Sequence, residues 1–196
     1  RNVAFFIPPA NNRPNYSPKS FTGAMHYIEA RYATEEEIAK EKNLVLNVYD
    51  QHENSTFFPH ASANVETRGE AVFAARNAVD GMYANSSHGR YPYQSWGINR
   101  DPNAALTVDF GREVVIRELR LTLRSDYPHD NYWVSGAVTF DDGSKEVLKL
   151  EKSEKPQCFK IKERKIKSFV LDKLIKAEGE SPFPALTQIE AWGVEA

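Results

Sequence analysis

The sequence predicts an all-β fold, an antiparallel sandwich or barrel, preceded by an N-terminal extension. From residue 57 onward, short segments of alternating apolar and polar residues are separated by turn residues, which is the pattern of half-buried strands. The turn Asp141-Asp142-Gly143-Ser144 between two such segments is of the Asp-Gly kind that closes β-hairpins. No further clear amphipathic helix follows residue 57. These three observations favour strands stacked in layers over a helical or mixed architecture.

The composition is that of a globular domain. With 196 residues, of which 41% are hydrophobic and 27% charged, the chain is long enough for one buried domain with an appendage. The net charge of -2 argues against a dedicated nucleic-acid binder. Basic residues gather between positions 145 and 176, but Lys160 and Lys162 alternate with apolar residues. We therefore interpret them as the solvent-facing side of a sheet, and we expect no nucleic-acid partner.

The sequence shows no segment typical of a membrane protein. No apolar run approaches the roughly 18 residues that a spanning helix needs, and the first residues lack the layout of a signal peptide. Cys158 is the only cysteine, which excludes an intrachain disulfide. The sequence leaves the compartment of the protein open.

Residues 1–56 are expected to form an extension that packs on the sandwich. Their first part is rich in proline and asparagine, which favour extended or irregular backbone. Thr34 followed by Glu37 is a capping box, which predicts a short surface helix over residues 35–42. The apolar run at 44–49 predicts a strand after this helix.

The rest of the chain is organised around residues 77–124. An Asp-Gly turn ends the stretch 77–81, and a long polar and aromatic loop follows it up to Trp96. Residues 106–110 and 119–123 then alternate apolar and polar side chains as half-buried strands do. Further strands are expected at residues 133–140, 145–150, 157–163, 165–174 and 186–194.

Several pieces of this region occur in a characteristic order. They are Asn77 to Gly81, Trp96, Leu106 to Gly111, Val115 to Leu123, and the closing Leu186 to Gly193. In this order they resemble the galactose-binding-like superfamily, which includes discoidin (coagulation-factor type C) domains and family 32 carbohydrate-binding modules. The resemblance implies a jelly-roll sandwich over residues 57–196 with Trp96 in its core. The chain is also similar to bacterial proteins of this class that are described as carbohydrate binders.

The resemblance further implies a structural calcium ion. Asp80, in the Asp-Gly turn, and Glu190, in the last strand, match the acidic ligands of such modules. Calcium takes about six to eight oxygen ligands, which two carboxylates and turn carbonyls can supply. The alternative is that Asp80 makes a local Asx turn while Glu190 lies on the wet face of its strand.

Polar and aromatic loops at one end of the sandwich predict a ligand site. Sugars need planar donors and acceptors for their hydroxyl groups and an aromatic face for the ring. We expect Arg124, Asp126, His129 and Asp130 to bind hydroxyl or acidic groups, with Tyr91 or Tyr93 stacking. Neighbouring candidates in the same and adjoining loops are Asn131, His60, Glu66, Arg68 and Arg90. The predicted function is non-catalytic binding of a carbohydrate, polyol or uronic acid.

Two other classes of function stay open. His129 and Asp130, with Glu66, offer acid-base chemistry for an enzyme acting on a sugar or an acidic saccharide. No serine elbow, zinc motif or phosphate loop supports that reading. A protein-interaction or adhesion module is the further alternative. The apex loops lack apolar spikes, so no membrane insertion is expected, and a homo-oligomeric contact would use the aromatic residues Phe5, Phe6, Phe21 and Tyr27.

Overall fold

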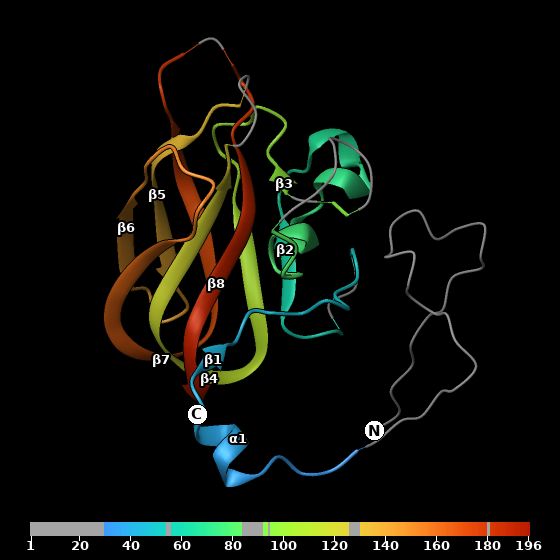
Figure 1. Cartoon of the computed structure of the whole chain (residues 1–196), viewed down its shortest axis with the longest axis vertical. Coiled ribbons are helices and arrows are strands. Elements are labelled where there is room, and N and C mark those ends of the chain that lie inside the picture. The colour runs from blue at the N-terminus through green and yellow to red at the C-terminus, as the bar shows by residue number, and fades with distance from the viewer. Residues whose placement is uncertain (1–29, 54–55, 84–91, 94, 126–129, 180) are drawn as a thin grey trace, which may run out of the picture.

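The computed structural model describes residues 30–53, 56–83, 92–93, 95–125, 130–179 and 181–196, and these residues form an antiparallel β-sandwich (Figure 1). The all-β prediction is confirmed. The strands in chain order are β1 (Lys42–Asn43), β2 (His60–Ala63), β3 (Trp96–Gly97), β4 (Leu106–Arg124), β5 (Trp133–Phe140), β6 (Lys145–Lys149), β7 (Gln157–Lys176) and β8 (Ala185–Glu195). One α-helix, α1 (Glu35–Ala39), precedes them, and short 3-10 helices at Thr67–Gly69, Ala71–Phe73 and Ala75–Ala78 lie between β2 and β3.

The two long strands β4 and β7 run through both layers of the sandwich. In one layer, residues 106–109 of β4 pair with β2 and with residues 168–171 of β7, and β7 continues to β5 and β6. In the other layer, the later part of β4 pairs with β8 on one side and with the first part of β7 on the other (Figure 1). A register shift after Asp109, with Gly111 at a positive φ of 66°, marks the bend of β4 between the layers.

The core fills the space between these layers. Trp96 and Trp133 are fully buried with ring centroids 6.4 Å apart, and Phe169 contacts both Phe110 and Phe140. The apolar side chains that alternate along β4, β5 and β8 point into the same space. Trp96 is therefore a core residue, as predicted.

The N-terminal segment differs in part from the prediction. Helix α1 has the expected capping box, in which Thr34 accepts from the Glu37 amide and Glu37 accepts from the Thr34 amide, but the helix ends at Ala39. The predicted strand at 44–49 is wrong, because only β1 pairs, with β8. Asn43 and Asn47 each accept a hydrogen bond from the backbone two residues later, and these Asx turns compete with strand pairing.

The C-terminal strands match the prediction closely. The segments expected at 157–163 and 165–174 are one continuous strand, β7, because Arg164 keeps an extended backbone between them and pairs with Ile116. Lys160 and Lys162 are exposed on its outer face, as expected. Among the described residues no helix has the length and apolar character to cross a membrane.

Candidate functional site

The connections at one end of the sandwich enclose a cleft. This end, uppermost in Figure 1, gathers the β4–β5 and β7–β8 connections and the segments before and after β3. The hollow, of about 230 Å³, is called the apex cleft here. Its lining residues are Thr67, Arg68, Phe73, Gly97, Ile98, Asn99, Arg100, Arg124, Pro182, Phe183, Pro184 and Ala185. Two of the sequence-predicted ligand residues, Arg68 and Arg124, thus come together in one cleft.

Arg124 ends β4 and is held by a buried ion pair. Its Nη2 donates to Oδ1 of Asp130 at 3.1 Å, and both side chains are less than one-tenth exposed. The pair satisfies the charge on each partner, which a buried guanidinium requires. The Nε of Arg124 is also buried and has no hydrogen-bond partner among the described residues. An unpaired buried N–H costs free energy, so this group is a candidate donor to a ligand oxygen.

The Asn131 side chain joins two loops by hydrogen bonds. Its Nδ2 donates to the carbonyl oxygens of Ser181 at 2.7 Å and Ala177 at 3.4 Å, and its Oδ1 accepts from the Tyr132 amide. These bonds tie the β4–β5 connection to the β7–β8 connection. The side chain therefore shapes the apex without presenting a free polar group to it.

Arginine and aromatic side chains line the two sides of the apex cleft. Arg68 binds Glu70 through Nε and Nη2 at 2.6 and 2.8 Å and stacks over Phe73 at 5.2 Å. Arg100 lies 4.7 Å over the ring of Phe183, which is 44% exposed. Sequence reasoning missed Arg100 and Phe183. The sequence signals only that both lie in loops, since the turn-forming Asn99 precedes Arg100 and prolines flank Phe183.

His60 and Glu66 have structural partners outside the apex cleft. His60 Nδ1 is 2.7 Å from Oδ1 of Asp50, whose Oδ2 accepts from the Ala61 amide. Burial raises the pKa of the Asp50 carboxyl, with the hydrogen bonds opposing it. Glu66 binds His52 Nε2 through one oxygen and the Ala75 amide through the other, both at 2.7 Å. Neither residue lines the apex cleft.

Of the five remaining predicted ligand residues, the structure describes only Tyr93. Tyr93 is half-buried, and burial raises the pKa of its phenol. It does not line the apex cleft. Arg90, Tyr91, Asp126 and His129 lie outside the described residues, as do the aromatic residues of the expected oligomer contact.

No protein-family model matches the sequence, and no curated protein sequence matches it. Solved structures do match it. The lectin domain of lectinolysin, complexed with Lewis b, aligns with 78% of this chain and 96% of its own at a TM-score of 0.56 and 15% identity. A chitosan-binding module of a Paenibacillus sp. IK-5 chitosanase/glucanase covers 79% of this chain and 100% of its own, at 0.52 and 16%. The family 32 module of Clostridium perfringens NanJ, in complex with galactose, covers 67% and 91%, at 0.50 and 15%.

The chain therefore shares the β-sandwich fold of these solved modules. At such low sequence identity the similarity extends to the fold alone. The ligand of this chain therefore depends on its own residues. The resemblance seen in the sequence also implies a calcium ion, and the residues around Asp80 and Glu190 show whether the side chains fit one.

Oxygen atoms of the turn after the last 3-10 helix converge on one atom of β8. The Nε2 of Gln188 lies 2.7 Å from the Asn77 carbonyl oxygen, 3.0 Å from Asp80 Oδ1, 3.4 Å from the Met82 carbonyl oxygen and 2.6 Å from the Thr187 carbonyl oxygen. Its Oε1 accepts from the Gly81 amide, which fixes the orientation of the amide group. A carboxylate with three carbonyls is a donor set typical of calcium, but here an amide nitrogen stands at its centre. As the side chains lie, these residues do not fit an ion.

Asp80 and Glu190 have separate hydrogen-bond partners. Burial raises the pKa of Asp80 to about 6, against the opposing effect of the hydrogen bonds from Met82 and Gln188. Glu190 accepts from the Tyr83 hydroxyl at 2.5 Å and from Trp192 Nε1 at 2.6 Å. It is 5% exposed, so the alternative of a wet strand face is wrong for Glu190. Within the described ranges, no group of three or more His, Cys, Asp or Glu side chains could hold a metal.

Proposed function

We propose that this chain is a non-catalytic carbohydrate-binding module that holds its ligand in the apex cleft. The observation that carries the proposal is the Arg124 guanidinium, which is buried, lines the cleft and has an unpartnered Nε. A sugar hydroxyl or ring oxygen would accept from that N–H, and the exposed ring of Phe183 offers an apolar face to the sugar. The sugar-binding functions named for modules of the same fold agree with this assignment.

The charges around the cleft favour an acidic sugar. Arg68, Arg100 and Arg124 line it, while none of its described lining residues is acidic. Glu70 neutralises Arg68 and Asp130 neutralises Arg124, so the surplus positive charge is small. We therefore expect galacturonate to bind a few-fold more tightly than galactose at low salt, and this preference to fade as salt screens it.

The test is isothermal titration with galactose, fucose, N-acetylgalactosamine, galacturonate and a chito-oligosaccharide. The decisive variant is Arg124→Lys, which keeps a positive charge beside Asp130 but removes the Nε donor. It should weaken binding about tenfold or more, because a hydrogen bond in this buried cleft is lost. The matched control is Arg112→Lys, at an arginine that pairs with Glu195 and does not line the cleft. Equal affinities for both variants, or no binding of any sugar, would overturn the proposal.

Phe183→Ala gives a second, independent reading of the same cleft. Phe183 is 44% exposed and lies in a loop outside the core, so its removal should leave the unfolding temperature within a few degrees of wild type. Loss of the stacking surface should weaken sugar binding by about threefold to tenfold. The enzyme alternative is distinguished by incubating the chain with the bound saccharide and looking for products. Turnover that is lost with affinity in Arg124→Lys would replace the binding proposal with the catalytic one.

A further inference from the structure

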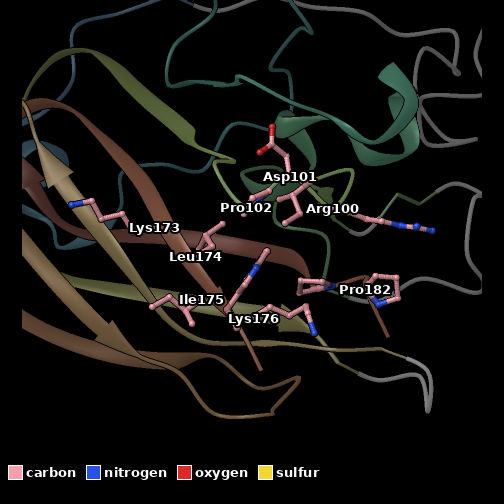
Figure 2. Close-up of a pocket in the computed structure, with 11 residues that line it drawn as sticks. Arg100, Asp101, Pro102, Lys173, Leu174, Ile175, Lys176 and Pro182 are labelled. Atoms are coloured by element: carbon pink, nitrogen blue, oxygen red, sulfur yellow. The ribbon is translucent and has the colours of Figure 1, made fainter. Parts of the chain in front are cut away.

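A second hollow lies beside the apex cleft and shares part of its wall. This flank pocket, of about 480 Å³, shares Ile98, Arg100, Pro182 and Pro184 with the cleft (Figure 2). The start of β5, the end of β7, and the connections on either side of the cleft form it. Its other lining residues are Asp101, Pro102, Trp133, Lys173, Leu174, Ile175 and Lys176. The volume is within the range of small-molecule sites.

The floor of the flank pocket is apolar and contains one orphaned donor. Trp133 and Leu174 are buried, and Ile175 at the margin is 58% exposed. The indole Nε1 of Trp133 is buried and has no hydrogen-bond partner among the described residues. The neighbouring Trp96, by contrast, donates its Nε1 to the Val65 carbonyl at 2.9 Å. Buried indole N–H groups are normally paired, so one residue that lines this pocket carries a donor that the described residues leave unused.

The rim of the flank pocket is positively charged. Arg100, Lys173 and Lys176 line it, and in Figure 2 the Lys173 and Arg100 side chains extend away from Leu174 to opposite sides of the pocket. Asp101 is the one acidic lining residue among those described. Its carboxylate points away from Leu174 in Figure 2, and its Oδ1 accepts from the Asn103 amide at 2.8 Å. The pocket therefore matches an apolar body that carries a negative charge at its edge.

We propose that the flank pocket binds an apolar organic anion, such as an aromatic or alkyl group bearing a carboxylate or sulfonate. The apolar part covers Leu174, Ile175 and the prolines, and the anionic group meets the lysines at the rim. The ligand is either a free molecule or a substituent on a saccharide held in the adjoining apex cleft. This site goes beyond the proposed sugar binding, because its walls and its rim charge are complete without a sugar.

The probe is 8-anilinonaphthalene-1-sulfonate, an aromatic sulfonate whose fluorescence rises in apolar surroundings. We expect saturable one-to-one binding to the folded chain that weakens as salt is added. Ile175→Asp should weaken it by about tenfold, because it removes an apolar wall and adds a like charge. Lys173→Gln removes one exposed charge and should weaken it by about twofold to fivefold. Both positions are exposed, so neither variant should disturb folding.

Matched controls separate the pocket from the rest of the surface. Val147→Asp makes the same change at a 73% exposed valine on β6, and Lys162→Gln removes a charge from the outer face of β7. Both should bind the probe like wild type. The proposal is overturned if the probe does not bind, or if each pocket variant binds it as tightly as its control. Circular dichroism and thermal melts of all five proteins exclude dye binding to unfolded chains as the cause of any difference.

Two further ligands distinguish the sources of the anion. A 4-carboxyphenyl β-galactoside is compared with methyl β-galactoside, and 4-methylbenzoate is tested alone. Tighter binding of the carboxyphenyl galactoside, lost in Ile175→Asp, identifies a saccharide substituent as the occupant. Competition of 4-methylbenzoate with the probe while neither galactoside binds identifies a free anion, and in that case the sugar proposal fails while the flank-pocket proposal stands.

Discussion

Replacing Gln188 with glutamate tests whether its side-chain amide nitrogen occupies a position where the surrounding oxygens could otherwise bind calcium. The Gln188 side chain is 2% exposed, and its Nε2 lies within 3.4 Å of four oxygens, one of them on Asp80. Q188E turns that donor into a carboxylate oxygen beside another carboxylate and three carbonyls. Burying an unpaired charge in this way costs roughly 3–5 kcal/mol of unfolding free energy. For a domain of this size, the unfolding midpoint should fall by about 6–20 °C.

Calcium should recover part of this loss in Q188E and leave wild type unchanged. In Q188E, Asp80 and the introduced carboxylate, each binding through one or both oxygens, add to the carbonyls of Asn77, Met82 and Thr187. The set then offers between about five and seven oxygens, close to what calcium needs. At 100 times its dissociation constant, calcium adds about 2.7 kcal/mol of stability, which raises the midpoint by roughly 5–11 °C.

The assay is a thermal melt of wild type, Q188E and Q157E, each with chelator and again with millimolar calcium. Gln157 is a matched control, because it hydrogen-bonds only the Glu151 backbone through its side chain and lies at the start of β7. Q157E should melt within a few degrees of wild type under both conditions. A calcium-dependent rise in wild type as large as that in Q188E would refute the reasoning. So would a Q188E protein that melts like wild type in chelator.

The remaining predictions concern charged groups whose environment the fold changes. Asp80 has a pKa of about 6 in the folded state against about 3.8 when unfolded, so its contribution to stability is present below pH 4 and is lost as pH rises through 6. In Asp80→Asn, the unfolding midpoint should therefore change less with pH across that window than it does in wild type. The pKa of Glu195 is lowered to about 2, chiefly by its hydrogen bonds from Arg112, so its stabilisation is present above about pH 4.5 and is lost as pH falls through 2. Glu195→Gln should therefore cost about 1 kcal/mol in urea unfolding at pH 7, and a loss that persists unchanged at pH 2 would contradict this assignment. Asp130→Ala leaves the Arg124 guanidinium buried and unpaired and should cost roughly 3–5 kcal/mol by the same measurement, whereas a cost under about 1 kcal/mol would show that the pair does not hold the apex.

The strands could be predicted because a strand that is buried on one face alternates apolar and polar residues in the sequence. The alternation in residues 106–110 and 119–123 predicted two strands, which the structure joins into the single strand β4, and the Asp-Gly turn after Phe140 predicted the β5–β6 hairpin. The capping box at Thr34 likewise placed the start of α1. The bend that makes β4 part of both layers has only Gly111 as its signal, and a single glycine does not reveal which strands will pair on either side of it.

The final strand shows why the site residues were harder to predict. In β8, Gln188 and Glu190 occupy the polar positions of an alternating pattern, which normally indicates a solvent-facing side. Both are buried, because the turn at 77–83 covers that face and supplies their partners, Asn77 and Asp80 for Gln188 and Tyr83 for Glu190. The covering segment lies more than 100 residues away in the chain, as the separations of 107 to 111 residues between hydrogen-bonded partners show. No local pattern reports such a contact.

Some polar residues of the predicted site stabilise the fold, and others leave polar groups for a ligand. The solved modules whose names mention galactose, Lewis b and chitosan share the fold of this chain at 15–16% identity, so the fold by itself does not identify a ligand. Of the residues that sequence reasoning assigned to the ligand, His60 and Glu66 stabilise the scaffold and Asn131 joins two loops. Arg124 differs from them because its ion pair leaves one donor unused at the cleft. A polar residue at the apex is therefore a candidate for ligand recognition when one of its donors or acceptors has no partner within the protein. Its position in a loop is not enough.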